Sequence, residues 1–189
     1  MQARRNPILR GRVLRPPVPL GERSPQPAVT GTVTGKAYFA VGVLLLAAFA
    51  MLELAHWRWP WLTRLQTDDV YKQVSGFALL ALVADQWRFS ALRAQGKLSQ
   101  AAALIRRHKW QGALAPVFFY FHSQGMGYAY TLALSVTFFA VFLTGLCNAE
   151  ITRIRKSWFH PVWVTAHVGL SSALLLLIAY HVYIGYVFE

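Results

Sequence analysis

Four of the six histidines in this chain fall into two pairs that share one spacing. His108 and His122 are 14 residues apart, and so are His167 and His181. Fourteen residues of α-helix advance about 21 Å and turn about 1400°, which is close to four full turns. We therefore expect each pair to lie along one face of one helix, with one imidazole near each end.

Imidazoles in this arrangement predict haem ligation, because neutral imidazole is a standard axial ligand of haem iron. If the two helices run in the same direction, His108 meets His167 at an inner level and His122 meets His181 at an outer level. The pattern then predicts two haem b groups, whose irons these two pairs ligate. Two axial histidines leave no open position on the iron, which favours electron transfer over oxygen binding. The alternative is that the histidines only make hydrogen bonds in helix packing.

Long uncharged segments predict the elements that position these histidines. No Asp, Glu, Lys or Arg occurs between residues 110 and 149 or between residues 157 and 188. The chain is 56% hydrophobic and 14% charged, whereas a soluble domain carries about 25% charged residues. Helix is the structure that satisfies its own backbone hydrogen bonds in lipid. We therefore expect these segments to cross a membrane.

The first uncharged segment is too long for one crossing. As a single helix its 40 residues would extend about 60 Å, roughly twice the thickness of the hydrocarbon layer. The polar, glycine-bearing stretch 123–127 is where it can turn. The sequence thus predicts an all-α integral membrane protein, a bundle of five transmembrane helices. Their expected ranges are 37–57, 71–92, 104–123, 127–148 and 160–187.

The placement of the basic residues predicts the orientation of this bundle. Of the 19 Lys and Arg residues, sixteen fall on the side of the N-terminus. The positive-inside rule then places the N-terminus inside and the C-terminus outside. It also accounts for the net charge of +12 without a nucleic-acid partner, and we expect none. The prediction is a multi-pass protein of the inner (plasma) membrane, with the lipid bilayer as its surroundings.

Composition divides the chain into two parts. Residues 1–36 contain six of the nine prolines and seven basic residues, and they predict a flexible Pro/Arg-rich cytoplasmic tail. Residues 37–189 form the expected haem-binding transmembrane domain. The single cysteine, Cys147, excludes an internal disulfide and a cysteine-rich metal site within the chain.

Other residues near the histidines have two interpretations each. Gly112 and Gly169 follow the inner pair and would let a flat macrocycle approach, although glycine also serves helix packing in membranes. Arg106 and Arg107, with Lys109, could pair with haem propionates, or could only determine topology. His56 and His160 fit no pair and are interpreted as structural. Asp85 is expected to bond to Gln86, Arg88 or a neighbouring helix.

The stretch from Arg106 to His122 and the stretch from His167 to His181 resemble the third and fifth helices of the ferric-reductase-like transmembrane domain superfamily. Ser75-Gly76-Phe77 is similar to a small-Gly-aromatic motif of its second helix. The resemblance implies a di-haem cytochrome b membrane subunit with two b haems between the third and fifth helices. Members with a reductase domain continue into a flavin and nucleotide domain. This chain has no Gly-rich dinucleotide motif, so we expect a separate electron donor or acceptor protein, or a quinone, within a larger membrane complex.

Two functions from different classes follow. The first is an electron-transfer subunit of an oxidoreductase complex, in which two bis-histidine b haems relay electrons across the membrane. The alternative is a haem-free accessory or assembly subunit of the membrane that docks through its N-terminal tail.

Overall fold

A computed structural model describes residues 31–154 and 156–188, and all of their regular secondary structure is helical. The helices are α1 (Gly31–Leu54), α2 (Pro60–Thr67), α3 (Asp69–Ala94), α4 (Leu98–His122), α5 (Tyr130–Leu146), α6 (Ala149–Thr152) and α7 (Phe159–Val187). Most of the predicted N-terminal tail, residues 1–30, lies outside the described residues. Residues 31–36 belong to α1, so this helix begins earlier than the sequence pattern predicts.

Five of these helices match the five predicted from the uncharged segments. They are α1, α3, α4, α5 and α7, and their bounds differ from the predicted ones by a few residues at most ends. Two short helices, α2 and α6, were not expected. The sequence pattern treated the region before α3 as a connection, but Pro60 begins a helical turn there because its fixed φ and missing N–H suit a first helical position.

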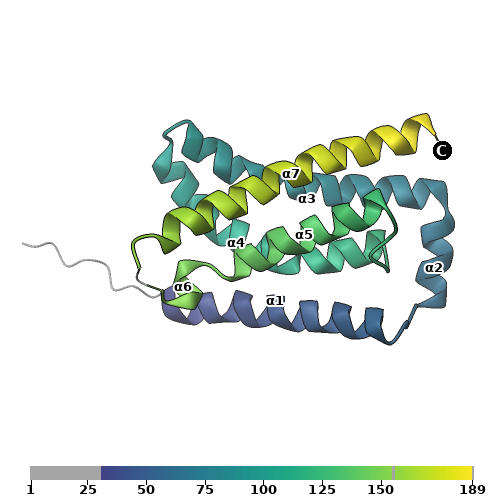
Figure 1. Cartoon of the computed structure of the whole chain (residues 1–189), viewed down its shortest axis with the longest axis horizontal. Coiled ribbons are helices and arrows are strands. Elements are labelled where there is room, and N and C mark those ends of the chain that lie inside the picture. The colour runs from purple at the N-terminus through teal and green to yellow at the C-terminus, as the bar shows by residue number, and fades with distance from the viewer. Residues whose placement is uncertain (1–30, 155, 189) are drawn as a thin grey trace, which may run out of the picture. The chain divides into compact units, whose positions relative to one another are not determined.

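The long helices lie side by side and alternate in direction (Figure 1). Helices α1, α4 and α7 run one way, and α3 and α5 run the other way. The closely packed pairs are α3 with α4, α5 with α7 and α1 with α4. The short α2 lies across the end of the bundle where α1 ends and α3 begins. The third and fifth predicted helices, α4 and α7, therefore run in the same direction, as the histidine spacing requires.

The core of the bundle is aromatic. Phe49 of α1 packs against Phe119 of α4 and Phe139 of α5, with ring centroids 5.5 and 4.7 Å apart. Phe138 stacks on Phe119 at 5.0 Å. Ala115 and Leu174 complete the buried cluster. Close packing of these rings gains van der Waals contact in water and in lipid alike, so this cluster fixes α4 against its neighbours.

Within residues 31–154 and 156–188, two helices are long and apolar enough to span a membrane, namely α1 over Lys36–Leu54 and α7. A third apolar helix, α5, is shorter. Only 17% of the α1 window and 6% of the α7 window are buried inside the protein. The core helix of a soluble protein would be mostly buried, so these exposed apolar surfaces favour membrane association.

The end of α4 is held by a buried glutamine in the predicted turn. The side-chain carbonyl of Gln124 accepts hydrogen bonds from the Trp59 amide at 2.8 Å and the Tyr120 hydroxyl at 3.1 Å. Its amide group donates to the Thr63 hydroxyl and the Gln66 carbonyl at 2.9 and 3.1 Å. The network ties α2, the turn and the last residues of α4 together, and this fixes the helix end that carries His122.

We expect Gln124→Ala to lower the stability of the protein by about 1–3 kcal/mol, because it leaves buried donors and acceptors without partners. The measurement is the apparent melting temperature of the purified protein in detergent. The matched control is Gln95→Ala, since Gln95 is exposed. Equal melting temperatures for the two variants would show that the network does not stabilise the fold.

Candidate functional site

The four paired histidines meet across the space between α4 and α7. The ring centroids of His108 and His167 are 6.3 Å apart, with the ring planes at 88°. Those of His122 and His181 are 6.2 Å apart, with the planes at 82°. The structure thus brings together the two pairs that the sequence predicts, at two levels of the bundle. All four side chains are half-buried.

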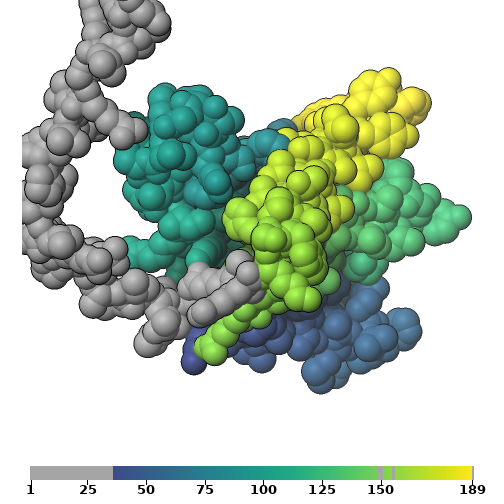
Figure 2. All heavy atoms as spheres, turned by 60° about the vertical axis from the view of Figure 1, so that its left-hand side comes forward, coloured from purple at the N-terminus to yellow at the C-terminus, as the bar shows by residue number. Residues whose placement is uncertain are grey.

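Apart from the two histidine contacts, α4 and α7 do not pack closely against each other. Each has a different close neighbour, α3 for α4 and α5 for α7. In the space-filling view the first part of α7 stands apart from the segment where α3 meets α4, with a hollow between them (Figure 2). A Cβ added at Gly112, one turn after His108 on the same face of α4, would meet no atom within 4 Å. Gly169 is exposed and, two residues after His167, lies on the other side of α7. The contact between these two helices at each level is therefore made by the histidine rings.

His122 is anchored by the neighbouring helix α3. Its Nδ1 lies 3.1 Å from the hydroxyl of Ser75. That hydroxyl also lies 3.2 Å from the backbone carbonyl of Lys72, to which it can donate. When the hydroxyl makes that bond, it accepts from the ring; since a neutral imidazole carries one proton, Nδ1–H is then the donor and Nε2 keeps its lone pair.

His167 is anchored in the same way by α5. Its Nδ1 lies 2.9 Å from the Thr144 hydroxyl, which donates to the backbone carbonyls of Ala140 and Val141, each at 2.9 Å. Trp163 stacks on the His167 ring at 5.8 Å and 6°. The indole N–H of this tryptophan donates to the Thr144 carbonyl at 2.7 Å. When the Thr144 hydroxyl donates to these carbonyls, it accepts from Nδ1–H, and the lone pair of Nε2 remains.

A glycine follows each of these hydroxyl residues and lets the ring approach the helix. A Cβ at Gly76 would lie 3.1 Å from Cε1 of His122, and a Cβ at Gly145 would lie 3.3 Å from Cε1 of His167. Both distances are shorter than ordinary van der Waals contact, so any other residue would push the ring away. The Ser75-Gly76 and Thr144-Gly145 segments therefore hold their histidines in equivalent ways.

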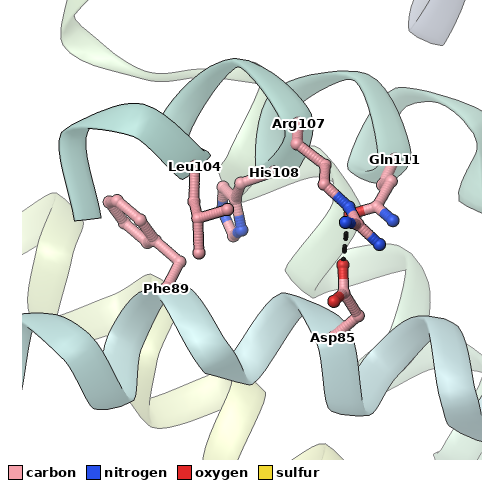
Figure 3. A pocket seen from close by; sticks show the side chains of 6 residues that line it. All are labelled: Asp85, Phe89, Leu104, Arg107, His108 and Gln111. Atoms are coloured by element: carbon pink, nitrogen blue, oxygen red, sulfur yellow. Dashed lines mark ion pairs between the residues drawn. The ribbon is translucent and has the colours of Figure 1, made fainter. Parts of the chain in front are cut away.

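His108 has different surroundings. Its ring stacks on Phe89 at 5.0 Å and 29°, and its Nδ1 is buried without a hydrogen-bond partner among the described residues. A small pocket beside it is lined from α3 by Asp85 and Phe89 and from α4 by His108 and its neighbours (Figure 3). His181, at the other level, lies 6.0 Å from the Tyr130 ring.

Asp85 bonds to its own helix and to the next one. Its carboxylate forms an ion pair with Arg88 of α3 at 3.2 Å. It forms a second ion pair with Arg107 of α4 at 3.0 Å (Figure 3). Beside it, Gln86 donates to the Gln111 side chain at 3.1 Å. The expected bonds to Arg88 and to a neighbouring helix are confirmed, whereas Gln86 instead bonds to Gln111. The predicted propionate partner Arg107 is thus engaged with Asp85 in this structure.

The remaining predicted residues lie at the edges of the site. Arg106 is exposed, and the Lys109 ammonium lies 5.3 Å from the Tyr38 ring centre. His56 has a φ of 52°, and the next amide, of Trp57, bonds to the Leu52 carbonyl at 3.0 Å. This is the left-handed C-terminal cap of a helix, so the structural interpretation of His56 fits.

Sequence reasoning missed the residues that orient the rings. Ser75 and Gly76 were named only because they resemble a family motif. The other residues beside the rings were not selected as site residues, namely Thr144, Gly145 and Trp163. The available signal was the repeated hydroxyl-glycine dipeptide on the helices that precede each histidine helix. A dipeptide of that kind is common in membrane helices, so the fold was needed to connect it with a histidine.

The spacing of the rings fits an iron between them. A bond from a metal to an imidazole nitrogen is about 2 Å long, and the nitrogen lies about 1 Å from the ring centre, so two axial rings should have centres about 6 Å apart. Within the described residues no three His, Cys, Asp or Glu side chains are grouped to hold a metal ion by themselves. Haem iron does not need such a group, because the porphyrin supplies four of its six ligands.

Comparisons of the chain with protein-family models, with curated proteins and with solved structures found no match. The resemblance described above therefore remains a prediction from the residues that carry it.

We expect Gly76→Ala to be less stable than Gly112→Ala when both are prepared without haem. Alanine normally stabilises a helix by up to about 1 kcal/mol over glycine. At Gly76 the added methyl must displace the anchored His122 ring, whereas at Gly112 it meets open space. Apparent melting temperatures in detergent test the order, and the reverse order would contradict the close approach at Gly76.

Proposed function

We propose that this protein is a membrane electron-transfer subunit that holds two b haems, the inner one by His108 and His167 and the outer one by His122 and His181. The observation that carries the proposal is the pairing of four imidazoles, with ring centroids 6.3 and 6.2 Å apart, from two helices that run in the same direction. In each pair one ring lies within hydrogen-bond distance of a hydroxyl through Nδ1, which leaves its Nε2 for a metal.

The proposal includes five spans in an inner (plasma) membrane. The exposed apolar faces of α1 and α7 support it, and so do the lengths of α3 and α4. Their 26 and 25 residues extend about 39 and 37 Å at the helical rise, enough to cross a hydrocarbon layer of about 30 Å. The sixteen basic residues on the N-terminal side support an N-terminus inside and a C-terminus outside.

The chain's own residues would bind the two haems, orient their histidine ligands and shield the haems from water. The four paired histidines would hold the haem irons, Ser75 and Thr144 would orient one ring of each pair, and the aromatic core around Phe119 would exclude water between the two levels. Arg106 and Arg107 lie on α4 beside His108, where a propionate would be neutralised. When bound, haem changes between the ferric and ferrous states and so supplies single-electron transfer.

The proposed partners are a separate electron donor and acceptor. Residues 1–189 contain no Gly-rich dinucleotide motif. A partner redox protein or a quinol in the bilayer would therefore deliver or remove the electrons, within a larger membrane complex.

We expect the purified protein to contain two haems per chain and to show b-type absorbance bands. Replacing His108 or His167 by alanine should remove one haem, and replacing His122 or His181 should remove the other. The double variant H108A/H122A should contain none. Pyridine haemochrome quantitation and a redox difference spectrum make the measurement.

The matched control is His56→Asn, because asparagine tolerates the positive φ of that helix cap. It should keep both haems. A folded, colourless wild-type protein would contradict the proposal and would favour the haem-free accessory subunit. For that alternative, deletion of residues 1–30 should abolish function while the loss of all four paired histidines should not.

The five-span topology makes a separate prediction. Reporter fusions at the C-terminus and in the connection 55–59 should be active only outside the membrane. Fusions in the connections 95–97 and 153–158 should be active only inside, because those segments hold the basic residues. A C-terminal fusion that reports from the inside would exclude five spans with this orientation.

A further inference from the structure

The two anchored histidines use one device on two helix pairs. In α3 and α4 a hydroxyl followed by glycine, Ser75-Gly76, holds His122 at the end of α4. In α5 and α7 the same combination, Thr144-Gly145, holds His167 in the first half of α7. The hydrogen bonds measure 3.1 and 2.9 Å, and the glycines leave 3.1 and 3.3 Å between an imagined Cβ and the ring.

Each hydroxyl has a second acceptor for its own proton besides the ring. This is a carbonyl of the preceding turn, that of Lys72 for Ser75 and those of Ala140 and Val141 for Thr144. A hydroxyl that donates to its carbonyl accepts from the Nδ1–H of the ring, and this is the arrangement that the inference uses. The imidazole can therefore neither rotate by half a turn nor exchange its tautomer without losing the bond.

The hydroxyl contacts also differ between the inner and the outer histidine pair. The outer pair is anchored through its α4 member and the inner pair through its α7 member. Of the opposite rings, His108 stacks on Phe89 and its Nδ1 has no hydrogen-bond partner among the described residues. At the inner level, Thr144 is thus the side chain that bonds to a ligand Nδ1, and a change there should leave the outer level alone.

A hydrogen bond from Nδ1–H increases the electron density on Nε2. A ligand of this kind is more basic and favours the ferric over the ferrous state. We infer that Ser75 and Thr144 are positioning residues that lower the reduction potentials of the outer and inner haem respectively and fix the planes of their ligands. This inference rests on the proposed function and adds two tuning residues to it.

The ligand planes provide a second readout. The rings cross at 88° in the inner pair and 82° in the outer pair. Nearly perpendicular axial imidazoles leave two iron d orbitals close in energy, and low-spin ferric haem then gives a strongly anisotropic EPR signal. A ring that has lost its hydroxyl anchor can rotate, and the signal of that haem alone should change.

The experiment is a potentiometric titration, with EPR of the oxidised form, on the haem-loaded full chain in detergent. Ser75→Ala should shift one of the two reduction potentials to a more positive value, and Thr144→Val should shift the other. Each should also weaken retention of its own haem by about tenfold or more, as losses of hydrogen bonds to metal ligands do. Thr144→Ser keeps the hydroxyl and should keep the wild-type potentials.

Two control variants remove a hydroxyl that does not contact a ring. Thr137 lies on the same helix as Thr144 and bonds only to the Ala133 carbonyl at 2.8 Å, and Ser172 bonds only to the Val168 carbonyl at 3.0 Å. Thr137→Val and Ser172→Ala should therefore leave both potentials and both EPR signals unchanged.

The possible results distinguish a failure of this inference from a failure of the proposed function. A wild-type chain without haem contradicts the proposed function. A wild-type chain with two haems whose potentials and EPR signals do not respond to Ser75→Ala or Thr144→Val contradicts the inference alone. If Thr144→Val does not load its haem, then Ser75→Ala and Thr144→Ser decide. An unchanged potential in Ser75→Ala, or a shift in Thr144→Ser that clearly exceeds the shifts of the controls Thr137→Val and Ser172→Ala, overturns the inference.

Discussion

A neutral imidazole inside an apolar bundle has one N–H to donate and one lone pair to share, and both must find a partner. In this protein the N–H of His122 and that of His167 find a hydroxyl on the adjacent helix, at 3.1 and 2.9 Å. The packing of α3 on α4 and of α5 on α7 brings these groups together. The lone pairs are then directed away from those neighbours, toward the space between α4 and α7.

This constraint gives the bundle two similar halves. Each half is a pair of closely packed helices, and in each pair one helix carries histidines while the other carries a hydroxyl and a glycine. The halves differ in which end of the histidine helix is anchored. The remaining rings meet different surroundings, Phe89 for His108 and Tyr130 for His181. The two levels are therefore alike in their histidines and different in their environment.

The sequence predicted the five long helices and the pairing of the histidines because both depend on simple periodicity. Uncharged length determines where a helix can cross lipid, and a spacing of 14 residues returns to the same helical face. Other features depend on contacts between distant segments. Gln124 bonds to Trp59 and Thr63 only because α2 folds across the bundle end, and Arg107 finds Asp85 only after α3 and α4 pack. No local pattern contains that information.

Both histidine pairs join residues that are 59 positions apart, because α4 and α7 run in the same direction and α5 must return between them. The connection between α3 and α4 is residues 95–97 and that between α5 and α7 is residues 147–158, so contacts within these helix pairs close shorter loops, at a smaller entropic cost, than the histidine pairs do. During synthesis from the N-terminus, neither histidine pair exists until α7 has been made. Both sites are therefore completed together, when α7 reaches α4.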